Sequence, residues 1–266
     1  RQSWQKQERL YHQLLWRAPS IKPNTAIITS EEILGHMGDY PTTFSINSMY
    51  EAKGSKQLPY WFFALSENFE FSVERLRENN SLEEQKANVF FKGDIENIIF
   101  LTYEPEKKQC LWVLRPEDAT YKDLPGEMKK AALMSKYENI SAGERENQLF
   151  HEIMEEDRNT WCFYYQKADL ARQMRDWVSV VSYWEAASET TYRPENGFEY
   201  IPFIEAYAYL GDWEQALALT QQARKTTQGM YLILCPTWQR LEQGTPASDT
   251  KADHVSKAYD VLKCSP

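Results

Sequence analysis

Two stretches 36 positions apart decide the fold: YAYLGDWEQAL over residues 207–217 and ARQMRDWVSVV over residues 171–181. Each reads as the end of one helix, a tight turn and the start of a second helix. Asp176 and Asp212 stand where a carboxylate can accept a hydrogen bond from the first turn of the second helix. The repeat therefore predicts two successive helical hairpins.

The turn residues differ between the two copies. Gly211 adopts a left-handed backbone angle at no steric cost, whereas Arg175 would adopt it only at some cost. A third helix pair is predicted over residues 230–243 and 249–264, interrupted by the Gly-Thr-Pro sequence that starts at Gly244.

The second copy closely resembles a tetratricopeptide repeat, through Tyr207, Leu210, Gly211, Asp212, Trp213, Ala216, Leu217 and Ala223. The first copy matches more weakly, through Ala168, Ala171, Val180 and Ala187. The sequence departs from that family in three ways: the period is 36 residues, Thr220 replaces a large apolar residue, and Arg175 replaces the turn glycine. The resemblance covers about residues 161–228 and implies packed hairpins that bind a protein or peptide partner.

The sequence before residue 124 has strand signals instead. Runs of apolar residues predict strands over residues 25–29, 60–65, 89–91, 97–103 and 110–114, several of them covered on both faces. A polar helix is expected over about residues 66–86, interrupted at Asn79-Asn80-Ser81. The fold class is therefore α/β plus α: a small sheet domain with covering helices over residues 1–123, then an all-helical hairpin module over residues 124–266.

Two more helices are expected at the start of that module. One opens at Pro125-Gly126-Glu127. The other begins near residue 143 and has an acidic cluster (Glu152, Glu155, Glu156 and Asp157) that is typical of a solvated face.

Residues 1–17 form an amphipathic helix in which Trp4, Tyr11, Leu14 and Leu15 share one stripe. Four basic side chains against one acidic side chain give this segment a positive charge. Aromatic and basic residues together suit a membrane–water interface. The alternative is a helix that packs on its own domain.

Charge and hydropathy exclude two classes of protein. The chain has 39 acidic and 30 basic residues and a net charge of −9, which argues against a general nucleic-acid binder. No stretch approaches the roughly 18 uncharged apolar residues of a membrane span.

The four cysteines and four histidines are scattered and give no local metal or haem signature. The cysteine spacing does not predict a disulfide scaffold, and Cys162 reads as a small buried residue rather than a nucleophile. No glycine-rich phosphate loop follows a strand, and no serine has a glycine elbow around it. We therefore expect no metal, no cofactor and no catalytic residue, and the redox compartment stays open.

A second, shorter resemblance rests on Trp16-Arg17-Ala18-Pro19 and Pro23-Asn24-Thr25 before a strand. These residues resemble the soluble segment after the transmembrane helices of bacterial multi-pass glycosyltransferases of the protein mannosyltransferase type (family 39). The resemblance implies a piece of a longer, membrane-anchored protein whose transfer chemistry lies in the membrane part.

We expect the working surface on the first helices of the two repeats, at Tyr164, Tyr200, Glu205 and Tyr207. The hypothesis is a non-catalytic, extracytoplasmic interaction domain that binds a protein or peptide and reaches the membrane through its parent protein. The alternative is a carbohydrate-binding or carbohydrate-processing domain of a membrane glycosyltransferase, in which aromatic rings and a carboxylate hold a glycan. A cytoplasmic location is the alternative for the compartment.

Overall fold

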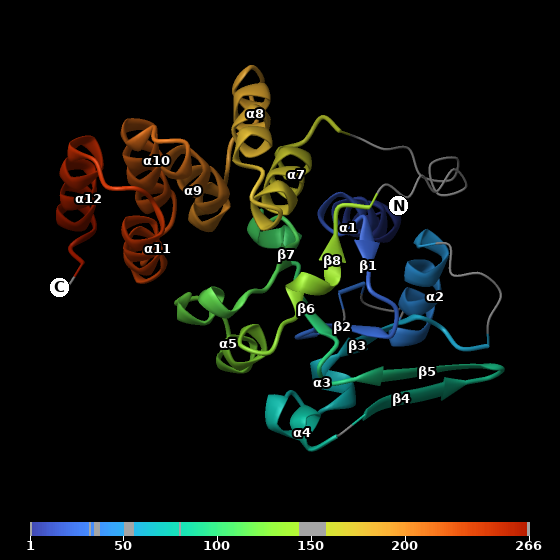
Figure 1. Ribbon diagram of the computed structural model, residues 1–266. Coiled ribbons are helices and arrows are strands. Elements are labelled where there is room, and N and C mark those ends of the chain that lie inside the picture. Colours follow the sequence, from blue (N-terminus) through green and yellow to red (C-terminus); the bar gives the residue numbers. More distant parts are fainter. Residues whose placement is uncertain are drawn as a thin grey trace. The chain divides into compact units, whose positions relative to one another are not determined.

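Two compact units make up the chain in the computed structural model, which describes residues 2–31, 33–34, 38–50, 56–79, 81–143 and 158–264. The sheet unit comprises Arg1–Glu104, Leu111–Ala119 and Leu124–Asp157, and the helical unit comprises Pro105–Cys110, Thr120–Asp123 and Arg158–Pro266. The sheet unit thus runs past the predicted boundary at residue 123 and includes α5 (Gly126–Ala132). A small sheet region with helices, then consecutive helices, confirms the predicted fold class (Figure 1).

The main sheet of the first unit has the strand order β3-β2-β6-β7. Its strands are β3 (Tyr60–Ala64), β2 (Thr25–Thr29), β6 (Ile98–Thr102) and β7 (Trp112–Val113). β2 lies parallel to β3 and β6, with Ile27 opposite Phe62 and Ile99, and β7 is antiparallel to β6. Every residue of β2, β3 and β6 is buried, as expected for strands covered on both faces.

The outer edge of β3 is closed by α2 (Asp39–Met49). The Asn47 side chain donates to the carbonyl of Tyr60 at 2.9 Å, and Thr43 Oγ1 accepts from the backbone N–H of Phe62 at 2.9 Å. Polar helix residues thereby satisfy backbone groups that an edge strand would otherwise expose.

The helical part of the polar segment after β3 ends at Glu78, next to the predicted interruption, but the part after the interruption is a strand and not the predicted helix. The segment contains α3 (Leu65–Asn68), α4 (Val73–Glu78) and then β4 (Ser81–Lys86), which pairs antiparallel with β5 (Val89–Asp94). β1 (Ser20–Ile21) and β8 (Ile140–Ser141) form a further small pair, although no strand was predicted after residue 124. Short 3-10 turns η1 (Pro105–Lys107), η2 (Pro116–Thr120) and η3 (Tyr137–Asn139) complete this part of the chain.

The first helix, α1 (Gln2–Arg17), packs within its own unit. Tyr11 and Leu14 are buried, whereas Trp4 is 46% exposed. Most of the apolar stripe therefore serves the core and not a membrane surface. Among the described residues, no helix has the length and apolar character needed to cross a bilayer.

The helical unit contains three hairpins in succession (Figure 1). They are α7 (Trp161–Gln173) with α8 (Trp177–Ser188), α9 (Ile201–Tyr209) with α10 (Trp213–Thr226), and α11 (Tyr231–Gly244) with α12 (Asp249–Leu262); the 3-10 turn η4 (Gly197–Tyr200) precedes α9. The predicted third pair is confirmed. The helix expected from residue 143 and its acidic cluster lie outside the described residues.

Candidate functional site

The turns of the first two hairpins are built as the repeat predicts. Asp176 accepts a hydrogen bond from the backbone N–H of Ser179, and Asp212 accepts one from Gln215, each at 3.1 Å. Gly211 has φ 87° and Arg175 has φ 58°, so both turns use the left-handed region. The left-handed backbone angle is strained for Arg175 but not for Gly211, because glycine has no Cβ. Both turns nevertheless have this left-handed conformation.

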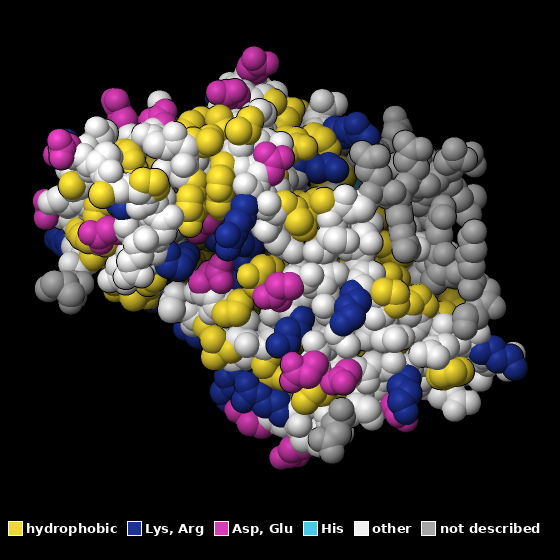
Figure 2. All heavy atoms as spheres, in the orientation of Figure 1, with side chains coloured by type: hydrophobic (Ala, Val, Ile, Leu, Met, Phe, Trp, Pro, Cys, Tyr) yellow, Lys and Arg dark blue, Asp and Glu magenta, His cyan; other side chains and the backbone are white. Residues whose placement is uncertain are grey.

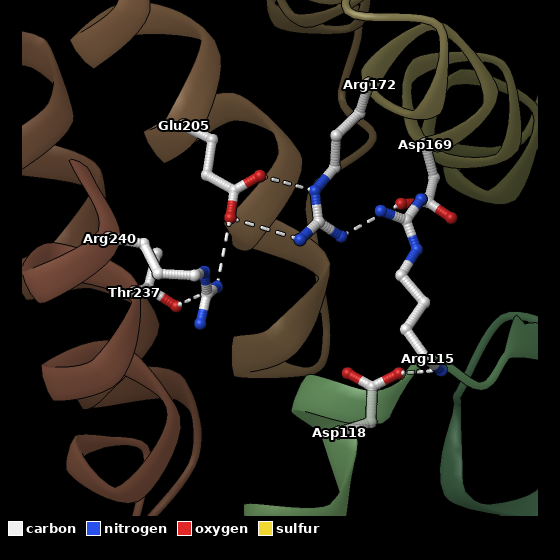
Figure 3. A network of polar contacts seen from close by, with 7 residues as sticks. All are labelled: Arg115, Asp118, Asp169, Arg172, Glu205, Thr237 and Arg240. Atoms are coloured by element: carbon white, nitrogen blue, oxygen red, sulfur yellow. Dashed lines mark hydrogen bonds and ion pairs between the residues drawn. The ribbon is translucent and has the colours of Figure 1, made fainter. Parts of the chain in front are cut away.

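An ion-pair ladder connects the first helices of the three hairpins (Figure 3). Arg172 of α7 donates from Nε and Nη2 to the two carboxylate oxygens of Glu205 on α9, at 2.6 and 3.1 Å. Its Nη1 lies 3.2 Å from Asp169, and Arg240 of α11 donates to Glu205 at 3.3 Å and to Thr237 at 3.1 Å. The ladder therefore fixes the register of α7, α9 and α11.

The members of this ladder are buried to different extents, which determines whether Glu205 can reach a ligand. Asp169, Arg172 and Glu205 are at most 9% exposed, whereas the Arg240 side chain is 43% exposed. Both oxygens of Glu205 accept hydrogen bonds from guanidinium groups. Glu205 therefore orders the helices and presents no open carboxylate to a substrate. Figure 3 also draws Arg115, whose backbone N–H donates to Asp118 at 2.7 Å in the sheet unit.

The three tyrosines expected at the site lie in different surroundings. Tyr200 is 6% exposed and packs against Trp184, with ring centroids 5.9 Å apart. Tyr164 is half-buried beside Phe163. Tyr207 is half-buried too; burial raises the pKa of its hydroxyl, and the nearby charges of Glu185 and Asp212 raise it further. Of these three, Tyr164 and Tyr207 keep surface that a ligand can reach.

A hydrophobic surface lies beside the two turns instead. We call it the apolar edge; it consists of Met174, Trp177, Val178, Tyr209 and Leu210. Val178 is 65% exposed, Leu210 48%, Met174 40% and Tyr209 38%. Trp177 stacks on Tyr209 with ring centroids 4.3 Å apart, which joins the two hairpins. Figure 2 shows hydrophobic side chains gathered over α8 and α9.

Sequence reasoning missed this surface, although a signal was present. Met174 and Leu210 occupy equivalent positions of the two repeats, immediately before the turn residue. Both side chains are exposed, at 40% for Met174 and 48% for Leu210, so burial in the core does not explain their recurrence. Large exposed apolar patches are typical of interaction sites.

Glu199 is a fully buried titratable group of the helical unit. Its carboxylate accepts hydrogen bonds from the backbone N–H of Cys110 at 3.1 Å and from Trp161 Nε1 at 2.7 Å. Complete burial raises the pKa of Glu199 to about 7, against the smaller lowering effect of these donors. The carboxyl group is buried against Trp161, the first residue of α7, and has no exposed surface, so its role is structural.

All four cysteines are paired in disulfides, which corrects the expectation from their spacing. Cys110 is bonded to Cys162 and Cys235 to Cys264, across sequence separations of 52 and 29 residues. Cys162 is therefore half of a crosslink and not a small core thiol. Both disulfides lie within the helical unit.

Across the part of the chain that the structure describes, no group of three or more His, Cys, Asp or Glu side chains could hold a metal ion. Comparisons with protein-family models, curated proteins and solved structures gave no match to this chain. The resemblances to tetratricopeptide repeats and to family 39 glycosyltransferases stay predictions.

Proposed function

We propose that this chain is a non-catalytic, extracytoplasmic interaction domain that binds a protein or peptide partner through its helical hairpins. The observation that carries the proposal is the apolar edge. Single exposed large apolar side chains are normal, but a group of them beside repeated turns is typical of a protein–protein contact. The Trp177–Tyr209 stack adds two aromatic rings, the residue type enriched at binding hot spots.

The two disulfides support the compartment in this proposal. Disulfides persist in oxidising environments and are rare in the cytosol. Four cysteines that all pair within one unit favour a secreted, periplasmic or luminal location. Attachment to a membrane through a parent protein is part of the same proposal and rests on the family 39 resemblance.

Glycan processing is less well supported. It needs a carboxylic acid that protonates a leaving group, with a second carboxylate at a set distance. Glu205, the carboxylate expected for this role, is occupied by Arg172 and Arg240.

The test is affinity capture from the extracytoplasmic fraction of the source cells, followed by affinity measurement with each purified captured protein. The bait is the chain or its Val178→Ser/Leu210→Ser variant, which removes apolar area without changing charge. We expect a captured protein whose Kd rises at least about tenfold with the variant. Glu67→Lys, at an exposed site of the sheet unit, is the control and should bind as wild type. Equal Kd values for all three baits would contradict the proposal.

A further inference from the structure

The apolar edge lies among acidic side chains. Asp176 and Asp212 cap the helices that start at the two turns and are exposed. Glu185 lies on the face of α8 seven residues after Val178, and Glu214 lies in the first turn of α10; both are exposed. Figure 2 shows acidic side chains beside the hydrophobic ones over α8 and α10.

Two of these carboxylates, Glu185 and Asp212, come from different hairpins and lie close to the same tyrosine. The negative charges of Glu185 and Asp212 both act on the hydroxyl of Tyr207, and that of Asp176 acts on Tyr183. Arg175 contributes one positive charge in the same turn. Asp176, Asp212, Glu185 and Glu214 outnumber this arginine, so the border of the apolar edge has a net negative charge. We call these four carboxylates the acidic rim.

We propose that the apolar edge receives a cationic amphipathic segment of its protein partner. An apolar face would lie against Val178, Leu210 and the Trp177–Tyr209 stack, while Lys or Arg side chains meet the acidic rim. This inference rests on the proposed function, because it names the chemistry of the partner. Charges of opposite sign at a rim steer association and exclude partners of the wrong sign.

The same rim disfavours two other occupants. An anionic lipid surface would be repelled by the four carboxylates, since such surfaces attract basic segments. A second copy of this edge would bring two negative rims together.

The experiment uses two fluorescent probes: an 18-residue helical peptide of Leu and Lys, and its counterpart in which every Lys is Glu. Binding to the full chain is followed by anisotropy at physiological salt. We expect wild type to bind the Leu/Lys probe at least about tenfold more tightly than the Leu/Glu probe. Glu185→Lys/Glu214→Lys should reverse this preference, and Val178→Ser/Leu210→Ser should weaken binding of the Leu/Lys probe.

The matched control is Glu67→Lys/Glu78→Lys, which makes the same change in net charge at exposed sites of the sheet unit. It should keep the wild-type preference. Thermal melts of every variant verify that each one folds. Equal loss of preference in the control, or no preference in wild type, would overturn the inference. So would concentration-dependent dimers that disappear in Val178→Ser/Leu210→Ser.

Failure of this inference is distinct from failure of the proposed function. If a captured partner depends on Val178 and Leu210 but tolerates Glu185→Lys/Glu214→Lys, the inference is wrong and the proposed function stands. If capture does not depend on Val178 and Leu210, the proposed function itself is wrong.

Discussion

Trp177 lies flat on Tyr209, with an angle of 7° between the ring planes and 4.3 Å between the ring centroids. This stack joins the start of α8 to the end of α9 and forms the middle of the apolar edge. A stacked aromatic pair contributes about 0.5–1.5 kcal/mol beyond the area that it buries. Trp177→Ala should therefore lower the free energy of unfolding by about 1–2 kcal/mol in urea titrations.

The matched control for this change is Val178→Ala at the neighbouring, 65% exposed position. It should change the free energy of unfolding by no more than about 0.5 kcal/mol. Equal effects of the two substitutions would show that the stack does not stabilise the hairpin pair.

Arg172 should be the most costly residue of the ladder to remove. Arg172→Ala would leave the buried Glu205 with Arg240 alone, and breaking a buried pair costs about 3–5 kcal/mol. Arg240→Ala removes the half-exposed end and should cost about 1 kcal/mol or less. Chemical denaturation of both variants measures their free energies of unfolding. Equal losses for Arg172→Ala and Arg240→Ala would mean that the ladder does not fix the helices.

The buried Glu199 predicts a pH dependence of stability. The pKa of Glu199 is about 7 in the folded chain, and in the unfolded chain it has its ordinary value of 4.5. Between these pH values the folded chain retains a proton that the unfolded chain releases. The stabilisation is complete below pH 4.5 and is lost as the pH rises to about 7. Its full size is about 3 kcal/mol, from 1.36 kcal/mol per pKa unit.

This dependence is measured as the free energy of unfolding from pH 4.5 to 7.5. Glu195→Gln, which removes an exposed carboxylate of the same segment, should retain the decline. Glu199→Gln should flatten it. A decline of equal size in both variants would assign the titration to another group.

The disulfides should stabilise the helical unit, and the one that closes the longer loop should contribute slightly more. Chain-entropy arguments give about 4 kcal/mol for the 52-residue separation and about 3.5 kcal/mol for the 29-residue separation. Cys110→Ser/Cys162→Ser should therefore lower the melting temperature at least as much as Cys235→Ser/Cys264→Ser. Mass spectrometry of the unreduced, denatured chain should find no thiol that reacts with iodoacetamide, and alkylation of any cysteine would contradict the pairing.

The predictable part of the fold is the part set by local chemistry. The caps at Asp176 and Asp212 and the strained turn at Arg175 follow from residues within one helical turn of each other. The strands β2, β3 and β6 follow from uninterrupted apolar runs. These elements were predicted because neighbouring residues specify them.

The wrong predictions concern features that depend on contacts between residues far apart in the sequence. The sequence Ser81–Lys86 is polar and charged, which favours a helix, but pairing with Val89–Asp94 and burial of Leu82 make it a strand. Cysteines 52 and 29 residues apart carry no local sign of pairing.

The prediction of the candidate site was incomplete for the same reason: contacts between distant residues shape the site. Burial of Glu205 depends on Arg172 and Arg240, which come from other helices, and a pattern along one helix does not reveal it. The exposed edge beside the turns follows from how the hairpins pack.

Site-specific photo-crosslinking in living source cells shows whether the apolar edge contacts a protein partner. A benzophenone amino acid replaces Val178 at the apolar edge or, as the control, the exposed Glu67 of the sheet unit. We expect one crosslinked protein partner from position 178, absent from position 67 and lost when Leu210→Ser/Met174→Ser is added. The same crosslinks from both positions, or none from position 178 in cells where the chain is abundant, would contradict this expectation.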